Sequence, residues 1–381
     1  MKRNNSLPTE RQIRQLLCKI RSTNCSTPNV SRTIPLIYHE LTQMDGKPYL
    51  LPFIVLRTSG CSWQRETGGC LVCNYSDIAS EIVSEKDLLQ QVEYGLDFLH
   101  KHPCPFVVFT ATANMFDDTE LPPSIRQFIF RSVAELGFVR QLYVESRAEF
   151  IDEDKVVSGL SFLNDVQLEV GIGLETSNDW IRKFCLHKGM STEEYVRAIQ
   201  VLQRHEVKTT TYIFLKPPFL TEREAIEDAL ASIRFALEIG SDLVILMLSN
   251  IQPNTLTHYL WKKGRYRVPW LWSAIHILSE MIPGDRERVR LAGLKSVPTP
   301  LETAHNCPQC TTVISDAIDR WRMSGDFCWI EALRAYPCSC REQWQEELAV
   351  PSVDLEERVR RGYETLFNEL LASNSEESHR A

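Results

Sequence analysis

The sequence lacks the features that would mark a membrane, secreted or strongly basic protein. No apolar run reaches about 18 residues, the length that crosses a bilayer as a helix. The first residues carry charge but no apolar segment of the kind found in secretory signals. Lys and Arg number 42 against 50 Asp and Glu, so the net charge is −8. We therefore expect a cytoplasmic protein without membrane contact. A basic footprint over the whole chain, as in many nucleic-acid binders, is absent, although a local basic patch stays open.

The sequence also lacks internal repeats and a complete glycine-rich nucleotide-binding motif, which argues against repeat folds and Rossmann folds. No internal repeat is evident. Gly171 and Gly173 lack the third glycine of the G-x-G-x-x-G fingerprint, which disfavours a dinucleotide-binding Rossmann fold.

Cysteine, in contrast, is abundant, with 12 residues in the chain. In a cytosolic protein such cysteines indicate metal binding or catalysis more often than disulfides. Three of them, Cys61, Cys70 and Cys73, lie in one short segment with the spacing C-x8-C-x2-C. A structural zinc ion takes four ligands, whereas an iron–sulfur cluster held by three cysteines keeps one iron open to a substrate. The segment therefore predicts such a cluster, with a three-cysteine zinc site or chance as alternatives.

The order of apolar and amphipathic segments predicts the fold class. Six apolar strands alternate with amphipathic helices, and Ser84, Ser191 and Thr221 are expected to cap three of these helices. Such alternation is typical of an α/β protein with a parallel sheet, whose active site lies at the carboxyl ends of the strands. The cysteine segment follows the first of these strands. The six expected strands cover residues 50–58, 105–113, 139–146, 165–176, 207–218 and 241–250.

Several segments carry a resemblance to a known family. The cysteine segment and its place after the first strand resemble the radical S-adenosylmethionine (SAM) superfamily, in the branch of the Elongator catalytic subunit and the radical-SAM (beta) subunit of archaeosine synthase. The resemblance covers about residues 35–345. It rests on FTATANMFDDTELPP (109–123), LYVESRAEFI (142–151), LEVGIGLETSNDWIRKFCLHKGMSTEEYVRA (168–198), IFLKPPFLTEREAIED (213–228), HNCPQC (305–310) and CSC (338–340).

The resemblance implies a partial (β/α)6 TIM-like barrel with a small C-terminal cysteine-rich metal-binding extension. We expect an N-terminal extension over residues 1–45, the radical SAM core over 46–290, and the cysteine-rich domain with a disordered tail over 291–381. It also implies that Cys61, Cys70 and Cys73 hold a [4Fe–4S] cluster. This cluster would cleave SAM to a 5′-deoxyadenosyl radical that takes a hydrogen atom from the substrate.

The same resemblance places SAM at the strand ends. Arg147 would bind the SAM carboxylate, because a guanidinium pairs with a planar carboxylate. Glu145 would accept hydrogen bonds from the amino or ribose groups, and Glu175 from the ribose. The alternatives are a surface ion pair for Glu145 and Arg147, and a helix-entry carboxylate for Glu175. The implied SAM contacts are therefore Thr112, Asn114, Glu145, Arg147 and Glu175.

A second cysteine group lies near the C-terminus. It has two pairs, C-x2-C and C-x-C, which approach the layout of a zinc ribbon. Four thiolates would fill a tetrahedral zinc and serve a structural role. A second iron–sulfur cluster and unliganded buried cysteines are the alternatives. The members are Cys307, Cys310, Cys338 and Cys340.

For function, the resemblance implies C–N cleavage of a lysine-modified 7-deazaguanine in tRNA. The implied partners are tRNA, a reductase or a flavodoxin or ferredoxin as electron donor, and a transferase subunit. The segment WKKGRYRVPWLW (261–272) would contact RNA by charge and stacking, or else pack against the barrel. Two other functions stay open, a radical SAM enzyme of this branch with a different substrate, and a non-catalytic metal-bound scaffold that binds RNA or a protein.

Overall fold

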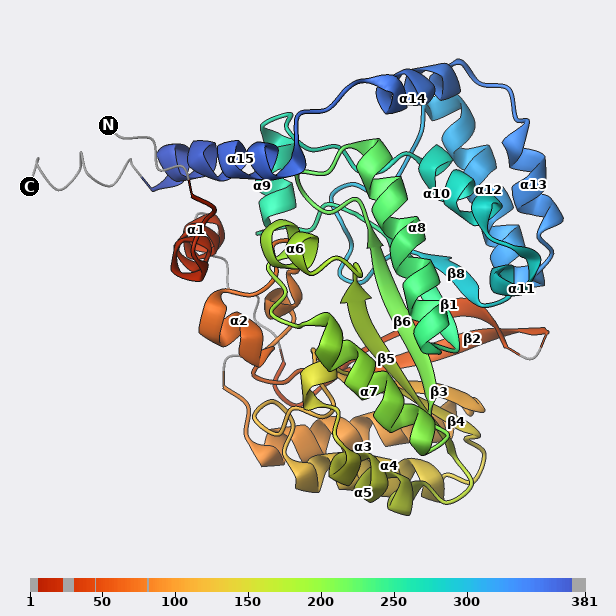
Figure 1. The fold of residues 1–381 in the computed structure, drawn as a ribbon. Helices are drawn as coiled ribbons and strands as arrows, with labels where there is room; N and C mark the ends of the chain where they lie inside the picture. Colours follow the sequence, from red (N-terminus) through yellow and green to blue (C-terminus); the bar gives the residue numbers. More distant parts are fainter. Residues whose placement is uncertain (1–5, 23–30, 45, 81, 372–381) are drawn as a thin grey trace, which may run out of the picture.

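The structure is a computed structural model, and it describes residues 6–22, 31–44, 46–80 and 82–371 (Figure 1). One eight-stranded sheet organises the chain, with the strands in sequence order from β1 to β8. The pairing of β1 with β2 is antiparallel, and every later pair in the sheet is parallel. The strands are β1 (Leu36–Met44), β2 (Lys47–Leu56), β3 (Phe106–Ala111), β4 (Gln141–Glu145), β5 (Gln167–Glu175), β6 (Lys208–Leu215), β7 (Leu243–Leu248) and β8 (Val289–Ala292).

Helices cover the outer face of this curled sheet and extend past its ends (Figure 1). The helices that follow the central strands are α2 (Ser62–Thr67), α3 (Glu85–Lys101), α4 (Pro123–Glu135), α5 (Glu153–Leu163), α6 (Asp179–Ile181), α7 (Thr192–Arg204) and α8 (Glu222–Ile239). The remaining α-helices are α1 (Glu10–Ser22), α9 (Leu256–Lys262), α10 (Leu271–Glu280), α11 (Pro283–Arg286), α12 (Pro308–Ser324), α13 (Cys328–Arg334), α14 (Ser339–Ala349) and α15 (Leu355–Leu370). Three short turns of other helix types are η1 (Tyr75–Asp77), η2 (Ala148–Phe150) and η3 (Arg182–Leu186).

Local sequence explains where the long helices start. Ser84, Ser191 and Thr221 each accept a hydrogen bond from the backbone N–H three residues on, and the acidic side chain at that position accepts one from the backbone N–H of the cap residue. These reciprocal bonds satisfy backbone N–H groups that a helix start leaves unpaired. The three caps expected from the sequence are therefore confirmed.

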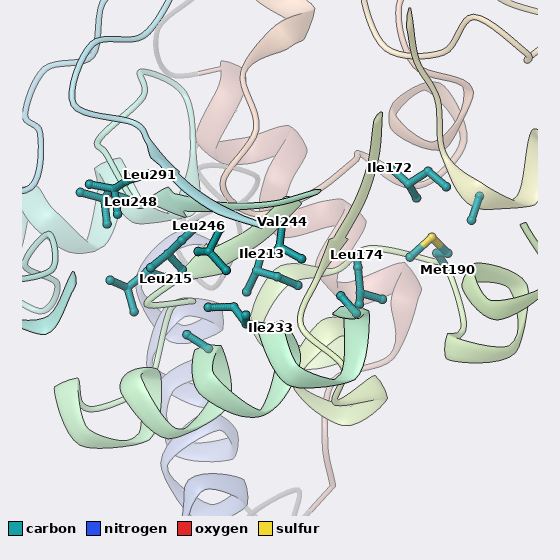
Figure 2. Packing of buried hydrophobic residues seen from close by; sticks show 14 of the residues in the cluster. Ile172, Leu174, Met190, Ile213, Leu215, Ile233, Val244, Leu246, Leu248 and Leu291 are labelled. Atoms are coloured by element: carbon teal, nitrogen blue, oxygen red, sulfur yellow. The ribbon is translucent and has the colours of Figure 1, made fainter. Parts of the chain in front are cut away.

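The core lies between the sheet and its helices. Strand residues alternate between the two faces of the sheet, so Ile213 and Leu215 of β6 and Leu246 of β7 point outward toward Ile233 of α8 (Figure 2). All four side chains are fully buried. The opposite strand face lines the inside of the curl, where polar and aromatic residues such as Gln141, Tyr143 and Tyr212 lie among apolar ones.

Two strands at the edges were not among the six expected. β1 lies within the stretch that the sequence analysis sets apart as an extension, yet it pairs with β2 along its full length. β8 adds four residues beside β7. The described sheet stays open between β1 and β8, and α12 packs against β1 and β2 at this side. We call this opening the seam.

No helix in the described part of the chain has the length and apolar character to span a membrane. The tail that the sequence predicts to be disordered lies, in its last ten residues, outside the described residues.

Candidate functional site

The cysteine segment forms a loop at the carboxyl end of β2, which we call the cysteine loop (residues 60–76). Cys61 stands at the start of α2, and Gly68 and Gly69 follow that helix with φ of 91° and 83°. Side chains rarely adopt this left-handed backbone. A Cβ on Gly69 would also lie 2.9 Å from Cγ of Gln64. The two glycines therefore allow the tight turn that brings the second and third cysteines back beside the first.

Groups from distant parts of the chain hold the cysteine loop from outside. Arg21 of α1 donates hydrogen bonds to the carbonyl oxygens of Gly68 and Cys73. The His187 ring pairs through Nδ1 with the Gly69 carbonyl at 2.8 Å, and the backbone N–H of Leu71 donates to Leu186 at 2.9 Å. These contacts fix the loop backbone in place without using the thiols.

A cavity of about 290 Å³ opens at the carboxyl ends of the strands, and we call it the central cavity. All three cysteines of the loop line it, and so do all five residues for which the sequence predicts SAM contact. Burial raises the pKa of the Cys70 thiol to about 12. Such a thiol stays protonated at neutral pH unless a cation takes the place of its proton. The lining residues already predicted are Cys61, Cys70, Cys73, Thr112, Asn114, Glu145, Arg147 and Glu175.

Arg147 presents a buried guanidinium to the central cavity. The residue is 6% exposed, and its Nε donates to the Glu149 carboxylate. The guanidinium carbon also lies 5.4 Å from the centre of the Trp63 ring. Its Nη2 has no hydrogen-bond partner within the part of the chain that the structure describes. A buried donor without a partner is costly, which favours an acceptor from outside the protein at this position.

The Glu145 carboxylate is hydrogen-bonded to a pair of tyrosine hydroxyls inside the curl of the sheet. Its Oε1 accepts a hydrogen bond of 2.8 Å from the Tyr212 hydroxyl, and that hydroxyl lies 2.6 Å from the hydroxyl of Tyr143. Burial raises the pKa of the Glu145 carboxyl, and the bond from Tyr212 partly offsets this rise. Gly171 leaves the necessary space, since a Cβ there would lie 2.0 Å from the Tyr143 hydroxyl.

Glu175 ends β5 beside a shift in strand register, with φ of 67°. Its carboxylate pairs with the ammonium of Lys188 at 2.8 Å. A Cβ on Gly173 would lie 2.4 Å from both partners. The second glycine of β5 thus gives room to this ion pair, as Gly171 gives room to the tyrosines.

A buried carboxyl group holds the segment after β3. Glu120 accepts hydrogen bonds from the Thr58 hydroxyl at 2.7 Å, the Ala113 backbone N–H at 2.8 Å and the Asn114 amide at 3.0 Å. Burial raises the pKa of Glu120 to about 7. The Asn114 amide also approaches the Cys61 sulfur at 3.9 Å, so this network positions the segment against the cysteine loop.

The C-terminal cysteines form a second, separate site. Cys307 and Cys310 lie at the start of α12, and Cys338 and Cys340 at the start of α14. Four of the distances between their sulfur atoms are 3.4 to 3.6 Å. A tetrahedral zinc with Zn–S bonds of about 2.3 Å would hold its sulfurs about 3.8 Å apart. The four thiols thus have a spacing that suits a single ion.

The cysteine loop differs from this compact group. Among the described residues, the set whose ligand atoms all lie within 4.8 Å of one another is the C-terminal four. The loop thiols are not gathered in that way. The three loop thiols therefore lack the close spacing of a single-ion site that the C-terminal four show.

The structure brings the predicted loop and strand-end residues together, and it adds residues that sequence reasoning missed. Parallel strands meet at their carboxyl ends, which is why β3, β4 and β5 deliver the predicted residues to one cavity. Lys188 reaches it from the chain after η3, and Tyr212 from inside β6. Strand pairing places Tyr212, the path of the chain after η3 places Lys188, and no local motif marks either residue. The additional residues are Arg21, Trp63, Glu120, Tyr143, Lys188 and Tyr212.

No protein-family model matches the chain. A protein named archaeosine synthase subunit beta from Methanosarcina acetivorans is 32% identical over 303 residues, which cover 78% of this chain and 84% of that protein. Its namesake from Thermococcus kodakarensis is 34% identical over 306 residues, covering 79% of this chain and 92% of that protein.

Two solved structures that the chain partly resembles have low TM-scores. Spore photoproduct lyase in complex with a dinucleoside spore photoproduct has a TM-score of 0.40 and 11% identity, over 83% of each chain. Coproporphyrinogen III oxidase from Escherichia coli, described as a radical SAM enzyme, has a TM-score of 0.40 and 12% identity, over 65% of this chain and 55% of the other. By its identity to the two archaeal relatives, the chain belongs to the archaeosine synthase subunit beta family.

Proposed function

We propose that this protein is a radical SAM enzyme of tRNA modification, which cleaves a C–N bond in a lysine-modified 7-deazaguanine and leaves an amidine. The observation that carries the enzyme assignment is the central cavity, which Cys61, Cys70 and Cys73 line together with Arg147, whose Nη2 has no hydrogen-bond partner among the described residues. The substrate rests on the name of the archaeal relatives, archaeosine synthase subunit beta.

Cys61, Cys70 and Cys73 would hold a [4Fe–4S] cluster, and SAM would lie beside it. When bound, the cluster and SAM together supply a carbon-centred radical that removes a hydrogen atom from the substrate. The protein contributes binding, orientation and exclusion of water. Burial of the Cys70 thiol, which is the main cause of its raised pKa, is consistent with a site that limits water.

Arg147 would bind a carboxylate of SAM through Nη2, while Glu149 and Trp63 keep its guanidinium in place. Glu145 uses one carboxylate oxygen for Tyr212 and keeps the other for a donor in the cavity. Charge-assisted hydrogen bonds of this kind are shorter and stronger than neutral ones, so the two residues would fix both ends of a zwitterionic group.

Glu175 and Lys188 would border the ribose side as an ion pair that is already formed. A pair that is satisfied before ligand binding need not be reorganised when SAM enters, which favours preorganisation of the cavity. Thr112 and Asn114 would line the opposite wall, where Glu120 holds their segment.

The C-terminal thiols would hold a zinc ion in a structural role. Their spacing supports one shared ion, and four ligands leave no open coordination position for chemistry. The indole N–H of Trp272 lies 3.2 Å from the Cys340 sulfur and would stabilise the thiolate charge in that site.

The proposed partners are tRNA, a second subunit and a one-electron donor. The name subunit beta of the relatives supports an assembly with another chain. A transferase that installs the lysine is the expected activity of that partner, because the modified base must be made before its C–N bond is cleaved.

Anaerobic reconstitution with iron and sulfide, followed by dithionite and SAM, tests the enzyme assignment. We expect about four irons at the loop and release of 5′-deoxyadenosine, both lost in Cys70→Ala. Cys328→Ala is the matched control, because Cys328 is exposed and lies outside both cysteine groups. Nucleoside analysis of tRNA that carries the lysine-modified base then tests the substrate. A cluster that forms without any cleavage of SAM would favour the scaffold hypothesis instead.

A further inference from the structure

A groove runs along the exposed side of α1, and we call it the α1 groove. It has a volume of about 820 Å³. None of its described lining residues is acidic or aromatic, although acidic residues outnumber basic ones in the chain as a whole. Its lining consists of Arg11, Arg14, Gln15, Cys18, Lys19, Ser22 and Leu371.

Two arginines give the α1 groove its charge. Arg11 and Arg14 are exposed and three residues apart, so their side chains project from neighbouring positions on one side of the helix. Neither forms an ion pair with any residue that the structure describes. Elsewhere on the surface many cations are neutralised, as Arg265 is by Glu369 and Arg361 by Glu357. The α1 groove is therefore a local positive surface on an acidic protein.

The same helix lies directly against the cysteine loop. A Cβ on Gly68 would be 3.5 Å from Cα of Arg14 and 3.4 Å from the Leu17 side chain. Arg21, two turns after Arg14, bonds to the Gly68 and Cys73 carbonyls. A helix with its side chains is roughly 10 Å across, so a molecule in the groove would lie about one helix diameter from the loop. The groove shares no described lining residue with the central cavity.

We propose that the α1 groove is the docking surface for a small acidic electron-transfer protein of the flavodoxin class. This inference rests on the proposed function, in which the loop holds a cluster that must be reduced. In the docked complex the donor is oxidised by one electron and the cluster is reduced by that electron, and no atom is transferred. The groove brings the donor close to the loop while the central cavity stays free for SAM and substrate.

Charge explains why a dedicated surface is needed. An acidic donor is repelled over long distance by a protein with a net charge of −8. Unpaired arginines beside the loop would attract and orient the donor where electron transfer is fastest. RNA fits the groove less well, because proteins that hold single-stranded RNA combine basic groups with aromatic side chains on which bases stack. The described lining of the groove offers charge without such rings.

The test compares Arg11→Glu/Arg14→Glu with a matched reversal, Arg140→Glu/Arg234→Glu. Arg140 and Arg234 are exposed, and neither has an ion pair in the described chain. Arg140 directly precedes β4, at the amino end of the strands and so away from the cysteine loop. Both double variants change the net charge equally. Binding of an oxidised bacterial flavodoxin is measured by fluorescence anisotropy, and 5′-deoxyadenosine release is measured with either photoreduced flavodoxin or dithionite as the reductant.

We expect the α1 variant to bind flavodoxin about 10-fold more weakly at low salt, with the difference shrinking at 1 M salt, where charges are screened beyond about 3 Å. Its flavodoxin-driven turnover should fall by a similar factor, while dithionite-driven turnover and iron content match the wild type. The inference is overturned if flavodoxin binding is unchanged, or if the control reversal weakens it equally.

It is also overturned if the α1 variant loses tRNA binding and keeps flavodoxin binding, because the groove would then be an RNA surface. Failure of the proposed function looks different. The wild type itself would release no deoxyadenosine with dithionite, and the docking inference would fail with it.

Discussion

Gly171→Ala should disturb the interior of the sheet by a predictable amount. The new Cβ would lie 2.0 Å from the Tyr143 hydroxyl, 2.7 Å from its Cζ and 3.1 Å from a ring carbon of Tyr212. Relief requires the Tyr143 ring to move by about 1 Å, and overpacking of this kind costs about 2 kcal/mol. Loss of the 2.6 Å bond between the two tyrosine hydroxyls adds about 1 kcal/mol. The lower backbone entropy of unfolded Ala returns up to about 1 kcal/mol, so the net loss is about 2 kcal/mol.

Urea unfolding of the anaerobically prepared protein measures this loss. The informative comparison is a cycle with Tyr143→Phe, which removes the atom at 2.0 Å and leaves the ring. Gly171→Ala should cost about 1 kcal/mol less in the Tyr143→Phe background than in the wild type. An equal cost in both backgrounds, or a stabilised Gly171→Ala protein, would refute the argument that Gly171 exists to make room for this hydroxyl pair.

Four further outcomes follow. Tyr212→Phe removes the hydrogen bond that lowers the raised pKa of Glu145, so the acid limb of SAM binding, followed by equilibrium dialysis against pH, should move to higher pH. Burial raises the pKa of Glu120 from 4.5 to about 7, so this carboxyl binds its proton more tightly in the folded state than in the unfolded state. The urea midpoint should therefore fall as the pH rises from about 4.5 to 7, and Glu120→Gln should make the midpoint less dependent on pH in that range. Arg147→Lys loses the planar fork, so the Kd for SAM should rise about 10-fold, while an unchanged Kd would exclude the carboxylate contact. Cys310→Ala should lose one zinc per chain by metal analysis and melt at a lower temperature, whereas Cys328→Ala should keep both.

The sequence predicted the central strands well because each is a short run rich in β-branched, aromatic and other apolar residues between amphipathic helical segments. All six expected strands are present as β2 to β7, and their boundaries differ by a few residues. β1 and β8 were not predicted, and the reason differs between the two strands. β1 carries polar residues such as His39 and Glu40 among its apolar ones, and β8 has four residues, too few to show a pattern.

The aromatic segment 261–272 shows what composition alone leaves open. Its charge and ring content suggested contact with RNA, with packing as the alternative. In the structure Tyr266, Trp270 and Trp272 are buried, and the Tyr266 hydroxyl donates to the Lys216 carbonyl at 2.7 Å. These three rings are part of the protein interior. Burial depends on neighbours that come from distant segments, and a short stretch of sequence does not contain that information.

The candidate site likewise contains residues that the sequence could predict and residues that it could not. Residues at strand ends, such as Glu145 and Arg147, could be found because topology alone brings such ends together. Lys188 and Tyr212 could not, because their place depends on the path of the chain after η3 and on the space left by Gly173 and Gly171. The partnerless Nη2 of Arg147 is likewise a property of three-dimensional packing.

Helix α12 connects the C-terminal thiols rigidly to the seam of the sheet. Its first turn carries Cys307 and Cys310, and near its other end Arg322 lines a cavity of about 400 Å³ together with Glu40 of β1 and Arg290 of β8. The 12 residues from Cys310 to Arg322 span about 18 Å of stiff helix, so a tilt of about 10° at the thiols would move the far end by about 3 Å. If these thiols hold the proposed zinc ion, its removal would loosen the wall of the sheet's interior at a distance from the thiols, and the width of the seam would depend on whether the zinc is bound.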